Sequence, residues 1–128
     1  PEQLKTSLKT LYPETDFSLK VIARTGWTTS NLISAINQEN LNSNYDLVTL
    51  LIGVNNQYQH IDFSVYQKEF PILLNKAIEL EPDFGYSYLQ RGFSKVKLEL
   101  VKQACVDFYK AKALGEDDAD EYLENYCE

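Results

Sequence analysis

The second half of the chain takes its fold from the stretch Asp83–Leu114, DFGYSYLQRGFSKVKLELVKQACVDFYKAKAL. Its apolar residues recur at helical spacing, and no part of it alternates as a strand would. When the sequence is shifted by 34 residues, Asn75-Lys76-Ala77 falls on Tyr109-Lys110-Ala111. A period of this length is typical of stacked helical hairpins. From Ser64 onward we therefore predict only helices, over residues 64–81, 83–97, 100–114 and 118–127.

The residue pattern within this stretch resembles the tetratricopeptide repeat (TPR) family. Tyr88, Gly92, Ala104, Phe108 and Ala111 stand at the spacings of that family's pattern. The small side chains of Gly92 and Ala104 allow two antiparallel helices to approach closely, and Phe108 fills the space between them. The resemblance implies one full repeat over 83–114, a capping helix over 117–128, and an incomplete repeat whose second helix, 64–81, is shared with the first half.

The TPR resemblance also implies a concave groove that binds a peptide from a partner protein. The residues that would line this groove are Tyr86, Leu89, Phe93, Val96 and Lys97. About one and a half repeats are present, whereas such arrays usually need about three units to bury their faces. The apolar groove residues could therefore instead be core that packs against the first half of the chain.

Residues 1–63 alternate between helical and strand-like patterns. Leu4, Leu8 and Leu11 recur at helical spacing, and Pro13 ends that run. Residues 17–23 alternate at their start and end in apolar, β-branched residues, and residues 46–52 are nearly all apolar, as strands are. Between them, Thr28 offers an N-cap oxygen for a helix over 28–39. The order helix, strand, helix, strand predicts an α/β segment with a two-stranded, βαβ-like unit.

Two short motifs in this half resemble the central part of the GDSL-like, or SGNH, hydrolase family. They are Thr25-Gly26-Trp27-Thr28-Thr29 and Ile52-Gly53-Val54-Asn55-Asn56, and the resemblance covers about residues 1–80. It implies a carboxylic ester hydrolase on a flavodoxin-like sheet. The Gly26 N–H and the Asn55 side-chain amide would then be the oxyanion-hole donors, a role that requires donors fixed at strand ends. Asn56 stands where that family more often has Asp.

The catalytic residues of that family have no counterpart in the chain. It contains no Gly-Asp-Ser nucleophile motif and no Asp-x-x-His motif, and its one histidine, His60, is predicted to lie in a loop. Two oxyanion donors without a nucleophile and a base cannot hydrolyse an ester. We therefore expect no complete catalytic site and no enzyme activity from this chain alone. The missing first strand of the flavodoxin-like sheet would lie between 17–23 and 46–52, so we expect a two-stranded sheet or one completed by another chain.

Composition excludes several classes of partner. The chain has 12 Lys and Arg against 19 Asp and Glu, and its net charge of −7 disfavours nucleic acid and anionic membrane surfaces. No apolar run approaches the roughly 20 residues that span a bilayer. Cys105 and Cys127 can form at most one disulfide and lie in no metal-binding spacing, so we expect no metal, no cofactor and a reducing, cytoplasmic compartment.

Three functional hypotheses remain. The first is a TPR-type protein-interaction or assembly module that carries a catalytically incomplete SGNH-like segment. The second is a fragment of an ester hydrolase whose Ser and Asp-x-x-His motifs lie outside this chain. The third is an engineered or recombined chimera without a physiological role, because the chain starts at Pro1 and contains no Met. For the first, we expect a protein or peptide partner, or self-association through an open sheet edge or the repeat ends.

Overall fold

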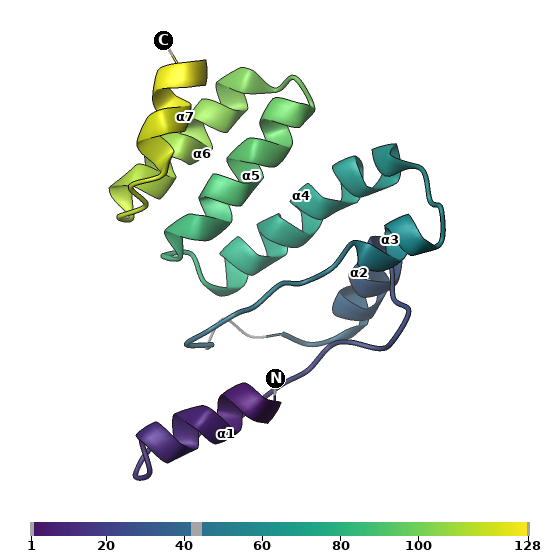
Figure 1. Ribbon diagram of the computed structural model, residues 1–128, viewed down its shortest axis with the longest axis vertical. Helices are drawn as coiled ribbons and strands as arrows, with labels where there is room; N and C mark the ends of the chain where they lie inside the picture. The colour runs from purple at the N-terminus through teal and green to yellow at the C-terminus, as the bar shows by residue number, and fades with distance from the viewer. Residues whose placement is uncertain (1, 42–44, 128) are drawn as a thin grey trace.

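The computed structural model describes residues 2–41 and 45–127, and over these ranges the chain is entirely helical (Figure 1). The described residues do not include Pro1, residues 42–44 or Glu128. Pro1 is the first residue of the expected 1–63 segment, and Glu128 is the last residue of the expected capping helix. The helices are α1 (Glu2–Leu11), α2 (Thr29–Gln38), α3 (Val54–Tyr58), α4 (Phe63–Leu80), α5 (Gly85–Lys97), α6 (Val101–Ala113) and α7 (Ala119–Tyr126).

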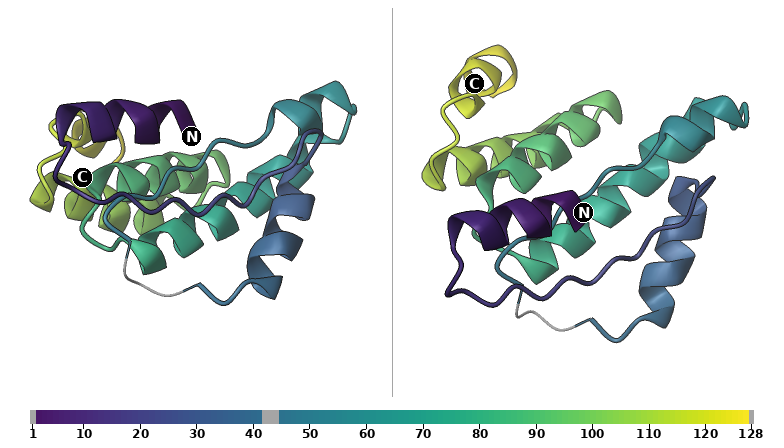
Figure 2. Two further views of the ribbon diagram at one scale, coloured as in Figure 1. Left: turned by 90° about the horizontal axis from the view of Figure 1, so that it is seen from below. Right: turned by 60° about the horizontal axis from the view of Figure 1, so that its bottom comes forward.

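The predicted α/β segment is wrong, because neither predicted strand forms. Residues 17–23 and 46–52 are extended runs that lead toward α2 and α3 (Figures 1 and 2). No hydrogen bond of the described residues joins the backbone of one run to the backbone of the other. A strand exists only through a paired neighbour. The helix between them, α2, packs against α4.

The helices predicted for the first half are present, with one addition. Thr28 caps α2 through a capping box in which its hydroxyl and the Asn31 side chain reach each other's backbone N–H groups. The short helix α3 forms where the sequence indicated only a loop. α1 forms where the leucine spacing predicted a helix, but it buries none of its residues, so Leu4 and Leu11 remain 48% and 71% exposed. Its helical periodicity predicted the element correctly but not a packing partner.

Helix α4 has neighbours on both sides. It packs against α2 on the N-terminal side and against α5 on the C-terminal side. Its N-cap is Asp62, which accepts a hydrogen bond from the Ser64 N–H. Ser64, which the sequence indicated as the start of this helix, lies inside its first turn. Pro71 lies within the helix.

The main core of the described residues lies between α5, α6 and α7, which pack in chain order and stand next to one another in Figure 1. A Cβ atom at Gly92 would lie 2.4 Å from the Phe108 ring, which confirms the predicted close approach of α5 and α6. Ala104 and Phe108 are fully buried. The buried core residues are Leu89, Ala104, Phe108, Ala111, Ala119 and Leu123.

A disulfide bond between Cys105 and Cys127 joins α6 to the end of α7. Such bonds persist in oxidising environments and are rare in the cytosol. The disulfide therefore disagrees with the reducing compartment that we expected from the sequence. None of the helices in 2–41 and 45–127 has both the length and the apolar character that crossing a bilayer requires.

Candidate functional site

The structure brings the two predicted oxyanion residues into neighbouring positions. Gly26 lies in the turn before α2 with a φ of +83°, and Asn55 lies in the first turn of α3. The Asn55 side-chain amide donates to the carbonyl oxygen of Trp27 at 2.9 Å. One turn later, the Gln59 amide donates to the carbonyl oxygen of Gly26, also at 2.9 Å. The two motifs, far apart in the sequence, are therefore held together by side chains of α3.

Asn56 is the buried centre of this contact. Its side chain is 4% exposed and bonds to Thr29 twice. The carbonyl oxygen of Asn56 accepts from the Thr29 backbone N–H at 2.9 Å, and its amide donates to the Thr29 hydroxyl at 2.8 Å. In the sequence, Asn56 stands out only as a departure from a family pattern. Its structural role is to fix the start of α2 against α3.

Glu69 of α4 completes the cluster, and no motif in the sequence indicated it. Its carboxylate accepts hydrogen bonds from the hydroxyls of Thr29 and Ser30, the latter at 2.7 Å. The Thr29 hydroxyl thus accepts a hydrogen bond from Asn56 of α3 and donates one to Glu69 of α4. The three helices α2, α3 and α4 meet at this one residue.

The groups that this cluster leaves without a described partner include two hydrogen-bond donors. The Gly26 N–H and the second amide hydrogen of Asn55 are not paired with any described residue. An oxyanion requires donors of this type. The hydroxyl groups of Thr29 and Ser30 are bound to a carboxylate and not to an imidazole. His60 is exposed, and no hydrogen bond of the described residues involves its imidazole.

The predicted groove residues divide between core and surface. Leu89 is 2% exposed and belongs to the core of α5, α6 and α7. Phe93 packs edge-on against Phe108 and Tyr122, and Val96 packs against the same core. These three residues therefore stabilise the helical array. Of the five, only Tyr86, which is 46% exposed, and Lys97 are exposed.

A charged network that sequence analysis missed joins α4, α5 and α6. Asp107 is 1% exposed and accepts two hydrogen bonds from Arg91, at 2.9 and 2.6 Å, and lies 2.8 Å from the Lys95 ammonium group. Arg91 also donates to the Asn75 side chain of α4 at 2.9 Å. The hydrogen bond to the Asp107 carboxylate raises the pKa of Arg91. All these groups satisfy one another, so the network is structural.

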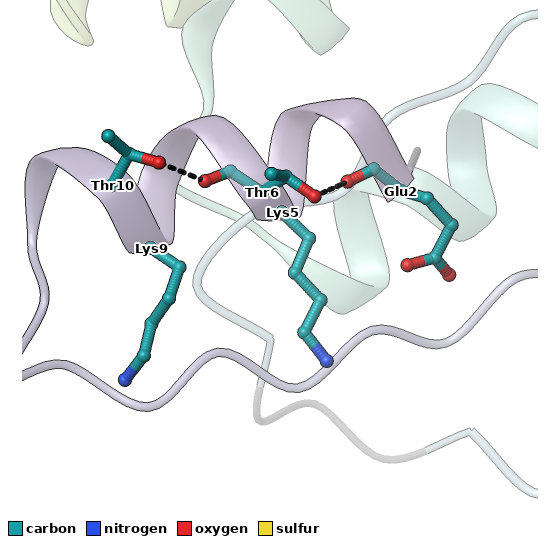
Figure 3. Close-up of a pocket in the computed structure, with 5 residues that line it drawn as sticks. All are labelled: Glu2, Lys5, Thr6, Lys9 and Thr10. Carbon is teal, nitrogen blue, oxygen red and sulfur yellow. Dashed lines mark hydrogen bonds between the residues drawn. The ribbon is translucent and has the colours of Figure 1, made fainter.

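Two surface hollows lie elsewhere. One, of about 280 Å³, lies between α2 and α4 and is lined by apolar Ile33, Ile36, Ile72 and Leu73 with polar Asn37, Asn75, Lys76 and Glu79. The other, of about 360 Å³, lies along one face of α1, where Figure 3 shows the Lys5 and Lys9 side chains directed toward the neighbouring chain trace. Lys9 donates to the Thr15 carbonyl oxygen at 2.9 Å. Neither hollow contains a buried charged group.

Within residues 2–41 and 45–127, no three His, Cys, Asp or Glu side chains are arranged to hold a metal ion. Comparisons of the chain with protein-family models, with curated proteins and with solved structures give no match.

Proposed function

We propose that this chain is a protein-interaction module of TPR type that carries a catalytically incomplete SGNH-like segment. The observation that carries the proposal is the serial packing of α4 on α5, α5 on α6 and α6 on α7, with Gly92 and Phe108 at the closest approach. Helical repeat arrays of this kind present extended surfaces for partner proteins. The partner is a protein or a peptide, and neither nucleic acid nor a membrane.

The two exposed residues of α5, Tyr86 and Lys97, mark the binding surface in this proposal. Tyr86 supplies a half-exposed ring close to that of Phe84, with their centroids 6.2 Å apart, and Lys97 supplies a positive charge at the other end of the helix. Aromatic side chains contribute strongly to protein interfaces. The expected ligand is therefore a peptide with an apolar side chain and a carboxylate.

The test is selection of peptides from a random displayed library on the purified chain. Selected peptides should bind the Tyr86→Ser/Lys97→Glu variant about tenfold more weakly. A matched control is Tyr109→Ser on α6, because Tyr109 is also exposed, at 58%, and lies on another helix. Failure to enrich any sequence, or equal binding by the α5 variant, would contradict this function.

A second candidate function is ester hydrolysis, and the proximity of Gly26 and Asn55 is the observation that favours it. In this candidate, the nucleophile and base are contributed by segments outside the 128 residues. The test is p-nitrophenyl acetate hydrolysis by the natural gene product, together with its intact mass. A mass above 14.7 kDa, with turnover that Asn55→Ala lowers by about 10²-fold, would support the hydrolase. A mass of 14.7 kDa without turnover would exclude it.

A further inference from the structure

The extended run Asp46–Ile52 has an almost unused backbone. Among the hydrogen bonds of the described residues, only one involves this run: the Val48 N–H donates to the Glu81 carboxylate at 3.1 Å. Backbone N–H and C=O groups in folded proteins are nearly always paired with protein or water. An extended run with free N–H and C=O groups is a template for strand pairing with another chain.

The side chains of this run alternate in exposure with the period of a strand. Leu47 is 53% exposed, Thr49 is exposed, and Leu51 is 99% exposed. The intervening Val48 and Leu50 are half-buried. A period of two is what an extended backbone with one covered face produces. The exposed face therefore consists of Leu47, Thr49 and Leu51.

The same three residues carry the free backbone edge. In an extended chain, the N–H and C=O groups of successive residues point to opposite edges. The Val48 N–H points toward Glu81 at the end of α4, which places the groups of the even-numbered residues on that edge. The N–H and C=O groups of Leu47, Thr49 and Leu51 lie on the opposite edge.

This edge is complementary to a second copy of itself. If two copies pair antiparallel about a twofold axis at Thr49, then Thr49 lies opposite Thr49 of the second copy. Leu47 then lies opposite Leu51 of the second copy. In this register the residues with free N–H and C=O groups are the ones that bond directly to each other, and the two exposed faces coincide. Leucine pairs and a threonine pair directly opposite one another stabilise antiparallel strands.

The local charge also permits self-contact at this segment. The chain as a whole carries a net charge of −7, which opposes association of two copies. The stretch Leu47–Tyr58 contains no charged residue, so two copies can approach there without direct repulsion. We propose that two copies of this chain associate through an isologous antiparallel pairing of Asp46–Ile52 centred on Thr49. The single chain has no strand here, and the pairing itself creates the ladder.

The experiment is sedimentation velocity across a range of protein concentrations with charge-swap variants. Leu47→Glu/Leu51→Glu places like charges directly opposite each other in the pair, and we expect it to be monomeric where the parent chain is dimeric. Leu47→Glu/Leu51→Lys places each Glu opposite a Lys of the second copy, and we expect this variant to regain the dimer. That regained dimer should weaken at high salt, because its new contacts are exposed ion pairs.

A control variant and the contrary outcomes keep this test decisive. Val106→Glu/Tyr109→Glu alters two other exposed residues, on α6, and should leave the dimer intact. Circular dichroism should show equal helicity for every variant, because Leu47 and Leu51 are exposed. A parent chain that stays monomeric at all concentrations, or a Glu/Glu variant that still dimerises, would overturn the proposal. Failure of the Glu/Lys variant to regain the dimer would overturn the register. The dimer can fail to form whether or not α5 binds a peptide, so this test and the test of the proposed function can fail separately.

Discussion

Gly92 of α5 lies against the ring of Phe108 of α6, with space for a hydrogen atom but not for a methyl group. A Cβ atom at residue 92 would lie 2.4 Å from Phe108 Cε1 and 2.7 Å from Cδ1. Phe108 is fully buried and also packs on Phe93 and Tyr122, so its ring has no free side toward which to move. The separation of α5 and α6 is therefore set by the absence of a side chain at residue 92.

Gly92→Ala should lower the free energy of unfolding by about 1–3 kcal/mol, the usual result of overpacking a core. The loss should occur although alanine is the better helix former. Chemical denaturation followed by circular dichroism measures it. Phe108→Leu in the Gly92→Ala background should recover part of the loss by making room for the methyl group. A Gly92→Ala variant that is more stable than the parent chain would show that the helices can separate freely.

The buried Asp107 carboxylate is predicted to be the most sensitive charged position. Asp107→Ala leaves Arg91 and Lys95 without their shared anion, and removing one partner of a buried pair is strongly destabilising. We expect a loss of about 2–3 kcal/mol, below the range for fully buried pairs because the two cations keep 19% and 20% of their side chains exposed.

The exposed pair Lys76–Glu79, with an N–O distance of 2.7 Å, is the matched control for Asp107. Lys76→Ala should change the free energy of unfolding by about 0.5 kcal/mol or less, because exposed pairs contribute little. Equal effects of Asp107→Ala and Lys76→Ala in urea denaturation would mean that the Asp107 network contributes no stability beyond that of a surface pair.

The disulfide should hold α7 onto α6. The bond joins residues 22 apart, and a loop of this size corresponds to about 3 kcal/mol of stabilisation. Reduction, or the Cys105→Ser/Cys127→Ser variant, should lower the melting temperature and speed hydrogen exchange in α7. The α2–α3–α4 contact, measured at the Thr29 amide, should keep its exchange rate, because it contains no cysteine. Equal loss of protection in both regions would contradict a local role for the bond.

Asp62 should make the start of α4 sensitive to acid. Its carboxylate accepts hydrogen bonds from the side chain and backbone of Ser64, and these lower its pKa below the ordinary value of 3.8. A depressed folded-state pKa contributes stability above the unfolded-state value, and this contribution is lost as the pH falls through the folded-state pKa. The parent chain should therefore be more stable than Asp62→Asn at neutral pH, and the difference should vanish in strong acid.

Asn caps a helix about as well as Asp, so Asp62→Asn isolates the charge from the cap. Urea denaturation of both proteins at several pH values gives the difference directly, because titration of the other carboxylates cancels in the comparison. A difference that stays constant below pH 3.8 would place the charge effect elsewhere.

The sequence predicted the helices well because their signals are local. The spacing of Leu4, Leu8 and Leu11, the cap at Thr28 and the repeat around Gly92 and Phe108 each act within a few turns of helix. α3 was missed because five residues are too few to show a helical period. The strands over 17–23 and 46–52 were wrong because apolar, β-branched composition indicates only the tendency to extend, whereas a strand requires a partner.

The candidate site was predictable only in part. Gly26 and Asn55 belong to sequence motifs, and the structure places the turn that contains Gly26 beside α3. Glu69 and Asp107 belong to no motif, and their importance comes from hydroxyls and cations that other helices bring to them. The sequence left open whether Leu89 and Phe93 line a groove or belong to the core, because an apolar side chain is equally suited to a ligand and to the core. Only the packing of α7 on α6, with Tyr122 against Phe93, decides between those two places.

The sequence by itself determined six of the seven helices in the described residues and the close contact of α5 and α6. These follow from short-range periodicity and from the absence of a side chain at Gly92. Tertiary structure alone decided that the two apolar runs remain unpaired, that Cys105 meets Cys127, and that Asn56 and Glu69 fix Thr29. Each of these depends on which distant segment arrives beside a residue, and no local pattern encodes that.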